Sequence, residues 1–65
     1  MNEYTIVDNA IKSLKIGGFT CMPIPQLRDN TYRFEENTLK KVSEEGCHLK
    51  WYDTFKGGSW HVLPN

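Results

Sequence analysis

The sequence predicts a small α+β domain with the element order α-β-β-α-β-β, in which two helices cover one face of a largely antiparallel sheet. Three observations lead to this prediction. They are an apolar stripe with helical spacing near the N-terminus, a shorter helical segment that ends in glycine, and two alternating segments near the C-terminus that match as a hairpin. The chain has 65 residues, so we expect residues 1–65 to form one domain.

The first helix is predicted to begin at Thr5 as its N-cap, with Asp8 in the first turn, where a carboxylate suits the helix dipole. Apolar residues then recur at spacings of three and four, which predicts a stripe that faces a sheet. The stripe consists of Ile6, Val7, Ala10, Ile11 and Leu14. Gly17 and Gly18 are expected to end this helix.

The segment Phe19–Ile24 alternates in character and is predicted to be a strand. Pro23 and Pro25 remove backbone donors, so this strand should lie at an edge of the sheet or fray early. Turn-forming residues in Gln26–Thr31 indicate a loop, and Tyr32–Phe34 is predicted to return as a short strand.

A second short helix is predicted from an N-cap at Asn37 through Glu45. Leu39 and Val42 are expected to point toward the core. Gly46 follows as a left-handed C-terminal residue, which would end the helix before the next strand.

The last third of the chain predicts a hairpin with a defined register. Pairing Trp51 with Trp60 also places Leu49 opposite Val62, so one face is apolar and can pack against the helices. Because side chains alternate across a strand, the opposite face gathers His48, Lys50, Tyr52, Ser59 and His61. We expect this second face to be open to water or to a ligand.

Charge and cysteine content exclude some classes of protein. Eight basic and eight acidic residues cancel, so no overall field draws the molecule toward nucleic acid or an anionic membrane. Cys21 and Cys47 allow at most one disulfide, and reduced thiols fit a protein of the cytosol. The longest apolar runs are far shorter than the roughly 20 residues that cross a bilayer. We therefore expect a soluble, cytoplasmic protein.

Zinc binding and catalysis are both disfavoured by spacing. Cys21, Cys47, His48 and His61 are suitable zinc ligands, but Cys47 and His48 are consecutive in a predicted strand and so point to opposite faces. A cysteine nucleophile with His61 as its base would need a cleft and a third, orienting group, for which a sheet with two helices has little room. We expect no metal, no cofactor and no enzymatic activity.

Nucleic-acid binding remains an alternative. Lys50, Tyr52 and His61, supported by Arg33 and Lys56, combine aromatic planes for base stacking with cations for phosphates. Against it, the net charge is zero and few cations share that surface.

Protein binding is the favoured hypothesis. Phe55 lies in the predicted turn beside Lys56 and two glycines, where a phenyl ring has nothing local to pack on unless the turn folds back over the sheet edge. Both conformations of this turn remain open from sequence. The predicted partner-binding residues are His48, Lys50, Tyr52, Phe55, Lys56 and His61. An accessory or inhibitory protein of bacterial or phage type would fit this size, and self-association would help so small a core.

Overall fold

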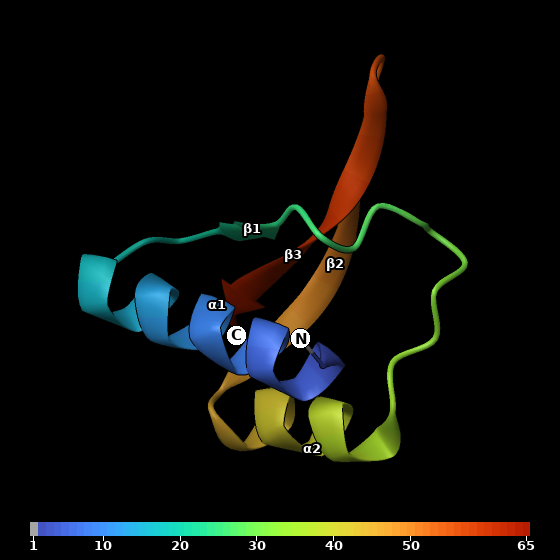
Figure 1. Cartoon of the computed structure of the whole chain (residues 1–65). Helices are drawn as coiled ribbons and strands as arrows, with labels where there is room; N and C mark the ends of the chain where they lie inside the picture. Colours follow the sequence, from blue (N-terminus) through green and yellow to red (C-terminus); the bar gives the residue numbers. More distant parts are fainter. Residues whose placement is uncertain (1) are drawn as a thin grey trace.

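The computed structural model describes residues 2–65 as two helices and a three-stranded antiparallel sheet (Figure 1). The elements in chain order are α1 (Glu3–Gly17), β1 (Met22–Ile24), α2 (Glu36–Glu44), β2 (Cys47–Thr54) and β3 (Gly57–Pro64). The strands lie in the order β1-β3-β2. The predicted α+β class, with both helices on one face of an antiparallel sheet, is confirmed.

The N-cap of helix α1 lies three residues earlier than predicted. The side chain of Asn2, not Thr5, is the N-cap, and its Oδ1 accepts a hydrogen bond of 2.8 Å from the backbone N–H of Thr5. Asn2 is the better cap because it also brings Glu3 into the first turn, where its negative charge interacts favourably with the positive end of the helix dipole. The predicted end is confirmed, since Gly18 is left-handed with φ 64°.

Helix α2 also differs from its predicted phase. It begins at Glu36, and its N-cap Glu35 makes no capping hydrogen bond through its side chain, so the predicted cap at Asn37 is wrong. Thr38 and Val42, four residues apart, face the core, whereas Leu39 is 48% exposed and was wrongly placed inward. Thr38 is a buried polar residue, and such a residue does not register in an apolar pattern, which explains the error.

The connection between β1 and α2 contains the largest error of prediction. Tyr32–Phe34 is irregular and forms no strand, because β1 already occupies the outer side of β3 and the N–H of Trp60 bonds to the carbonyl of Leu27 at 3.0 Å. Strand β1 is shorter than predicted, although its place at an edge of the sheet is confirmed.

The predicted hairpin register is confirmed throughout. Strands β2 and β3 pair Trp51 with Trp60 and Leu49 with Val62. The face carrying these residues packs against the helices, with α1 over β1 and β3 and α2 over β2. The core so formed consists of Val7, Ala10, Ile11, Leu14, Ile24, Val42, Cys47 and Val62.

Candidate protein-binding surface

The β2–β3 hairpin extends beyond β1 and beyond the two helices. Strand β1 pairs with β3 only from Trp60 to Val62, so beyond Trp60 the hairpin has no third strand. Figure 1 shows its far end extending past the helices and past β1. This projecting end presents side chains to solvent from both strands.

The hairpin tip, Thr54–Gly57, is a tight turn with Phe55 and Lys56 between the paired end residues. Gly57 has φ 117°, a conformation that residues with a Cβ rarely adopt. The hydroxyl of Thr54 donates a hydrogen bond of 3.0 Å to the carbonyl of Gly57, which restrains the turn in addition to the backbone pairing of these two residues. The turn is therefore fixed by backbone geometry and leaves its two central side chains free.

Phe55 is the most exposed large apolar side chain in the described residues, at 95%. The turn does not fold back over the sheet edge, which resolves the alternative that the sequence left open. The ammonium of Lys56 lies 5.7 Å from the centre of the phenyl ring and is also exposed. Other apolar side chains reach the surface too, but none of them sits on a projecting turn: Tyr4, Ile16, Phe19 and Leu39.

The open face is the side of the sheet turned away from the helices. Its centre is an edge-to-face contact between Tyr52 and His61, with ring centres 4.7 Å apart, and the ammonium of Lys50 lies 5.3 Å from the Tyr52 ring. The Nδ1–H of His61 donates to the carbonyl of Ser59 at 3.1 Å, which fixes the imidazole. At the far end of the face, exposed His48 contacts the Asn65 side chain at 2.8 Å.

Two apolar residues of the open face were missed by the sequence analysis. Pairing places Leu63 opposite His48, and Pro23 of β1 opposite His61. Leu63 follows His61 at a spacing of two, so the alternation used for β3 could have found it. Pro23 could not be found because its register depends on the β1–β3 pairing. The structure thus brings His48, Lys50, Tyr52 and His61 together on one face, beside the apolar residues Leu63 and Pro23, whereas Phe55 and Lys56 lie at its end.

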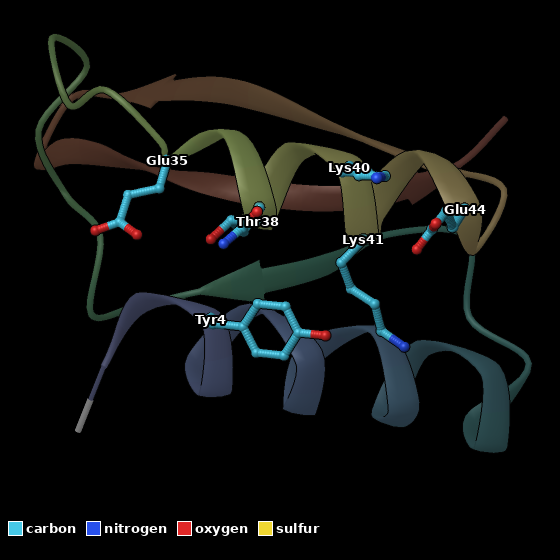
Figure 2. A pocket seen from close by; sticks show the side chains of 7 residues that line it. Tyr4, Glu35, Thr38, Lys40, Lys41 and Glu44 are labelled. Carbon is cyan, nitrogen blue, oxygen red and sulfur yellow. The ribbon is translucent and has the colours of Figure 1, made fainter.

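A hollow that the sequence did not predict lies between the two helices (Figure 2). It is an open pocket of about 470 Å³, lined by Tyr4, Glu35, Asn37, Thr38, Lys40, Lys41 and Glu44. Its lining carries charges of both signs, two glutamates and two lysines. Its lining contains no histidine, cysteine or serine that could act as a nucleophile or base at neutral pH.

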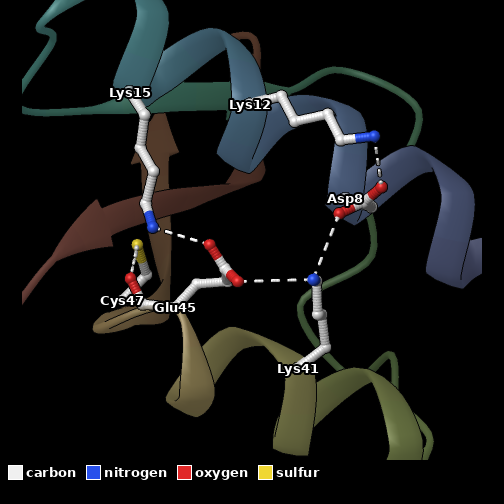
Figure 3. Close-up of polar contacts among 6 residues, drawn as sticks. All are labelled: Asp8, Lys12, Lys15, Lys41, Glu45 and Cys47. Carbon is white, nitrogen blue, oxygen red and sulfur yellow. Dashed lines mark hydrogen bonds and ion pairs between the residues drawn. The ribbon is translucent and has the colours of Figure 1, made fainter.

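The cation at one side of this pocket is already engaged by neighbouring carboxylates (Figure 3). Lys41 lies 3.3 Å from Glu45 and 3.8 Å from Asp8, and Glu45 also pairs with Lys15 at 2.6 Å. The cation of Lys15 and then that of Lys41 hold the pKa of Glu45 below its ordinary value. This network links α1 to the end of α2, so its charges serve the fold.

Glu3 and Tyr32 form a second polar contact that ties a loop to α1. The Tyr32 hydroxyl donates to Glu3, and the N–H of Glu35 donates to the other carboxylate oxygen at 3.0 Å. Partial burial would raise the pKa of Glu3, but hydrogen bonds from Thr38, Tyr32 and Glu35 outweigh it and lower the pKa. The hydrogen bond to Glu3 raises the pKa of Tyr32 to about 12. Since neither group borders the open face, we read both shifts as structural.

The cysteines and histidines do not converge. Cys47 is buried on the core face and His48 is exposed on the open face, as alternation in β2 requires. Cys21 and Cys47 are both free thiols. Within residues 2–65, no three histidine, cysteine, aspartate or glutamate side chains come together as a metal site.

Comparisons with protein-family models, with curated proteins and with solved structures gave no significant match to this chain. In the part of the chain that the structure describes, neither helix has the length and apolar character needed to span a membrane.

Proposed function

We propose that this chain is a small non-enzymatic binding protein that holds another protein against the tip and the open face of its last hairpin. The observation that carries the proposal is Phe55, a phenyl ring 95% exposed on a projecting turn. We further propose that it acts in the cytoplasm, where its two free thiols would stay reduced, as an accessory or inhibitory protein of bacterial or phage type.

Energetics favour Phe55 as the anchor of such a contact. Covering a phenyl ring that is otherwise in water is worth about 1.5 to 3 kcal/mol, and aromatic side chains dominate the binding energy of many interfaces. The turn that carries the ring is already fixed by the Thr54 hydroxyl and the Gly57 backbone. Little conformational entropy is then lost when a partner closes around it.

The open face supplies a surface next to this anchor. His61 and Leu63 of the central strand β3, with Pro23 beside them on β1, form a partly apolar centre. Lys50 and His48 lie on the outer strand β2, where Tyr52 contacts His61. An apolar centre with a polar margin is the usual anatomy of a protein interface. The contact between Tyr52 and His61 restricts both rings before binding, which lowers the cost of association.

Nucleic-acid binding is the second candidate, and the Lys50–Tyr52–His61 cluster is the observation that favours it. Against it, Tyr52 already has His61 against its ring and Lys50 near it, so less of its surface remains for a base to stack on. Lys50 is also the only permanently charged cation among the described residues of that face. We therefore keep protein binding as the proposed function.

Affinity capture with paired variants tests the proposal. Immobilised wild-type protein, Phe55→Ala and Phe19→Ala are compared, the last as a control because Phe19 is also an exposed phenylalanine but lies between α1 and β1. We expect Phe55→Ala to weaken partner binding by about tenfold or more, and Phe19→Ala to leave it unchanged.

A nuclease arm separates the two candidates. Capture that survives nuclease and depends on Phe55 supports a protein partner. Capture that disappears with nuclease, falls steeply with salt and depends on Tyr52 instead would replace the proposal with nucleic-acid binding.

A further inference from the structure

The outer edge of β2 is a place where a strand of another chain could pair with this sheet. Strand β2 has eight residues and lies at the end of the sheet order β1-β3-β2. The sheet order has no further strand beyond β2, and Figure 2 shows α2 passing in front of the face of the sheet. An edge strand of this length exposes a row of backbone donors and acceptors that another strand can use.

Two hydrogen bonds identify which backbone groups face outward. The N–H of Trp60 bonds to Leu27, away from β2, and the N–H of Asn65 bonds to Gly46, on the side of β2. Because this direction alternates along a strand, Ser59, His61 and Leu63 are the β3 residues whose backbone faces β2. Their partners are Tyr52, Lys50 and His48, which leaves Leu49, Trp51 and Asp53 with outward N–H and C=O groups.

The two edges of this sheet differ in protection. Strand β1 is three residues long, contains Pro23 and is followed by Pro25, all of which discourage pairing of another chain. Strand β2 contains no proline. Outside the β2–β3 ladder, no backbone hydrogen bond among residues 2–65 involves Leu49, Trp51 or Asp53.

We propose that the outer edge of β2 pairs antiparallel with the same edge of a second copy of this chain, which joins two three-stranded sheets into one. The direction of the backbone groups permits only registers in which Leu49, Trp51 and Asp53 pair among themselves. This condition limits the two-fold axis to a few positions along β2.

Charge and length select one of these positions. An axis through Lys50 opposes two lysines, and an axis through Asp53 opposes two carboxylates, both of which are destabilising. An axis through Leu49 or Tyr52 loses pairs, because β2 begins at Cys47 and its turn follows Thr54. An axis through Trp51 pairs the whole segment 48–54 with its copy.

The register centred on Trp51 is also complementary in its side chains. It sets the half-buried Trp51 against Trp51 of the second copy, and Lys50 against Tyr52, a cation beside an aromatic ring. The net charge of zero adds no overall repulsion. The pairing uses the backbone edge of β2 and does not require the proposed function, since Phe55 lies outside the paired segment and the side chains of His48, Lys50 and Tyr52 lie on the open face.

Sedimentation of the full chain over about 0.01 to 1 mM tests the proposal. High concentrations are needed because an interface made by one pair of short strands is expected to be weak. We expect the mass to rise with concentration from 7.6 kDa toward twice that value. A mass that stays at the monomer value throughout overturns the proposal and leaves the edge to some other chain.

A pair of variants at one position tests the edge itself. Asp53→Pro removes an outward N–H and places a ring on the edge, whereas Asp53→Ala keeps that N–H. Both variants lose the carboxylate that accepts a hydrogen bond from the Trp51 indole, so the comparison isolates the backbone group. We expect Asp53→Pro to weaken self-association by about tenfold or more relative to Asp53→Ala, with the same far-ultraviolet circular dichroism. Equal self-association of the two variants overturns the use of this edge.

Disulfide trapping tests the register without relying on the proline variant. One variant carries Lys50→Cys and a second variant carries Tyr52→Cys, each in a chain with Cys21→Ser. The two variants are mixed and oxidised. The Trp51 register places these two positions opposite each other in a pair whose Cα atoms are close enough for a disulfide. A mixed disulfide between the two variants supports it, whereas disulfides confined to pairs of Lys50→Cys chains overturn it.

Discussion

At its base the β2–β3 hairpin is covered by both helices, whereas its tip extends into solvent with no third strand beside it. Val62 at the base is 0% exposed, and Phe55 at the tip is 95% exposed. The same two strands and the same ladder run through both regions. The difference teaches that packing at one end of a hairpin can fix the position of its other end. The side chains at the tip are then not needed for the stability of the fold.

The Trp51–Trp60 pair marks the boundary between these regions. Trp60 lies on the covered side, where its indole N–H donates to the carbonyl of Asp29 at 2.9 Å and its ring packs edge-to-face on Phe34 at 5.0 Å. The indole of Trp51 instead bonds within β2, to Asp53 at 2.5 Å. The two rings contact each other with centres 5.8 Å apart.

The first prediction uses this pair, because one residue type occurs on both sides of the boundary. Trp60→Ala should lower the free energy of unfolding by about 3 kcal/mol, since it releases a loop as well as leaving a cavity. Trp51→Ala should cost about 1 to 2 kcal/mol, since its ring has fewer neighbours. Urea unfolding measures both losses of unfolding free energy. Equal losses would contradict a boundary between a covered base and an exposed tip at this pair.

The second prediction concerns Glu3, which anchors the loop that covers the base. Glu3→Gln should cost about 1 to 2 kcal/mol at neutral pH, because hydrogen bonds to a charged acceptor become bonds to a neutral one. Since the folded-state pKa of Glu3 is lowered, its contribution is present above the unfolded pKa and is lost as pH falls through the folded value. The acid side of the stability profile should therefore be shallower in Glu3→Gln.

Tyr32 gives the same contact a signature at high pH. Its pKa is raised from 10.0 to about 12, so its contribution is present below pH 10 and is lost as pH rises toward 12. Ultraviolet titration should show one of the three tyrosines ionising late, and Glu3→Gln should return it toward 10.0. Three tyrosines that titrate together in the wild type would argue against the contact.

The third prediction tests whether the tip is fixed by its backbone. Gly57→Ala should cost about 1 kcal/mol, because φ 117° is strained for a residue with a Cβ. Lys56→Ala at the neighbouring position, where φ is not positive, should stay within about 0.5 kcal/mol. Thermal melts of the two variants make the comparison, and an unaffected Gly57→Ala would mean a turn that relaxes freely.

The smallest expected effect belongs to the residue proposed to matter most for binding. Phe55→Ala should change the free energy of unfolding by no more than about 0.5 kcal/mol, because its ring contacts little but the Lys56 side chain. Urea unfolding beside the wild type measures this difference. A loss as large as that of Trp51→Ala would place Phe55 in the core and remove the anchor of the proposed interface.

The hairpin was predictable from sequence because both of its constraints are local. Alternation in two neighbouring segments and a glycine-containing turn fix the register without knowledge of the rest of the fold. For the same reason His48, Lys50, Tyr52 and His61 were placed together correctly. The turn itself left two conformations for Phe55, since whether a ring folds back depends on what lies beside it.

The errors arise where tertiary contacts decide between equal local choices. Asn2 and Thr5 are both good caps, and the contacts of Glu3 with Tyr32 and Glu35 favour the earlier start. Tyr32–Phe34 has the composition of a strand, but β1 already fills the place beside β3. No local pattern in the sequence records that competition.

Amide hydrogen exchange along β3, measured residue by residue at low protein concentration, tests the central claim most directly. The N–H groups of Leu63 and His61 at the covered end, and of Gly57 at the tip, all face β2, so the ladder alone would protect them alike. We predict that Leu63 and His61 exchange only through global unfolding, whereas Gly57 opens at a free energy at least about 2 kcal/mol lower. Uniform protection along the strand would contradict the division of the hairpin into a stabilising base and a free tip.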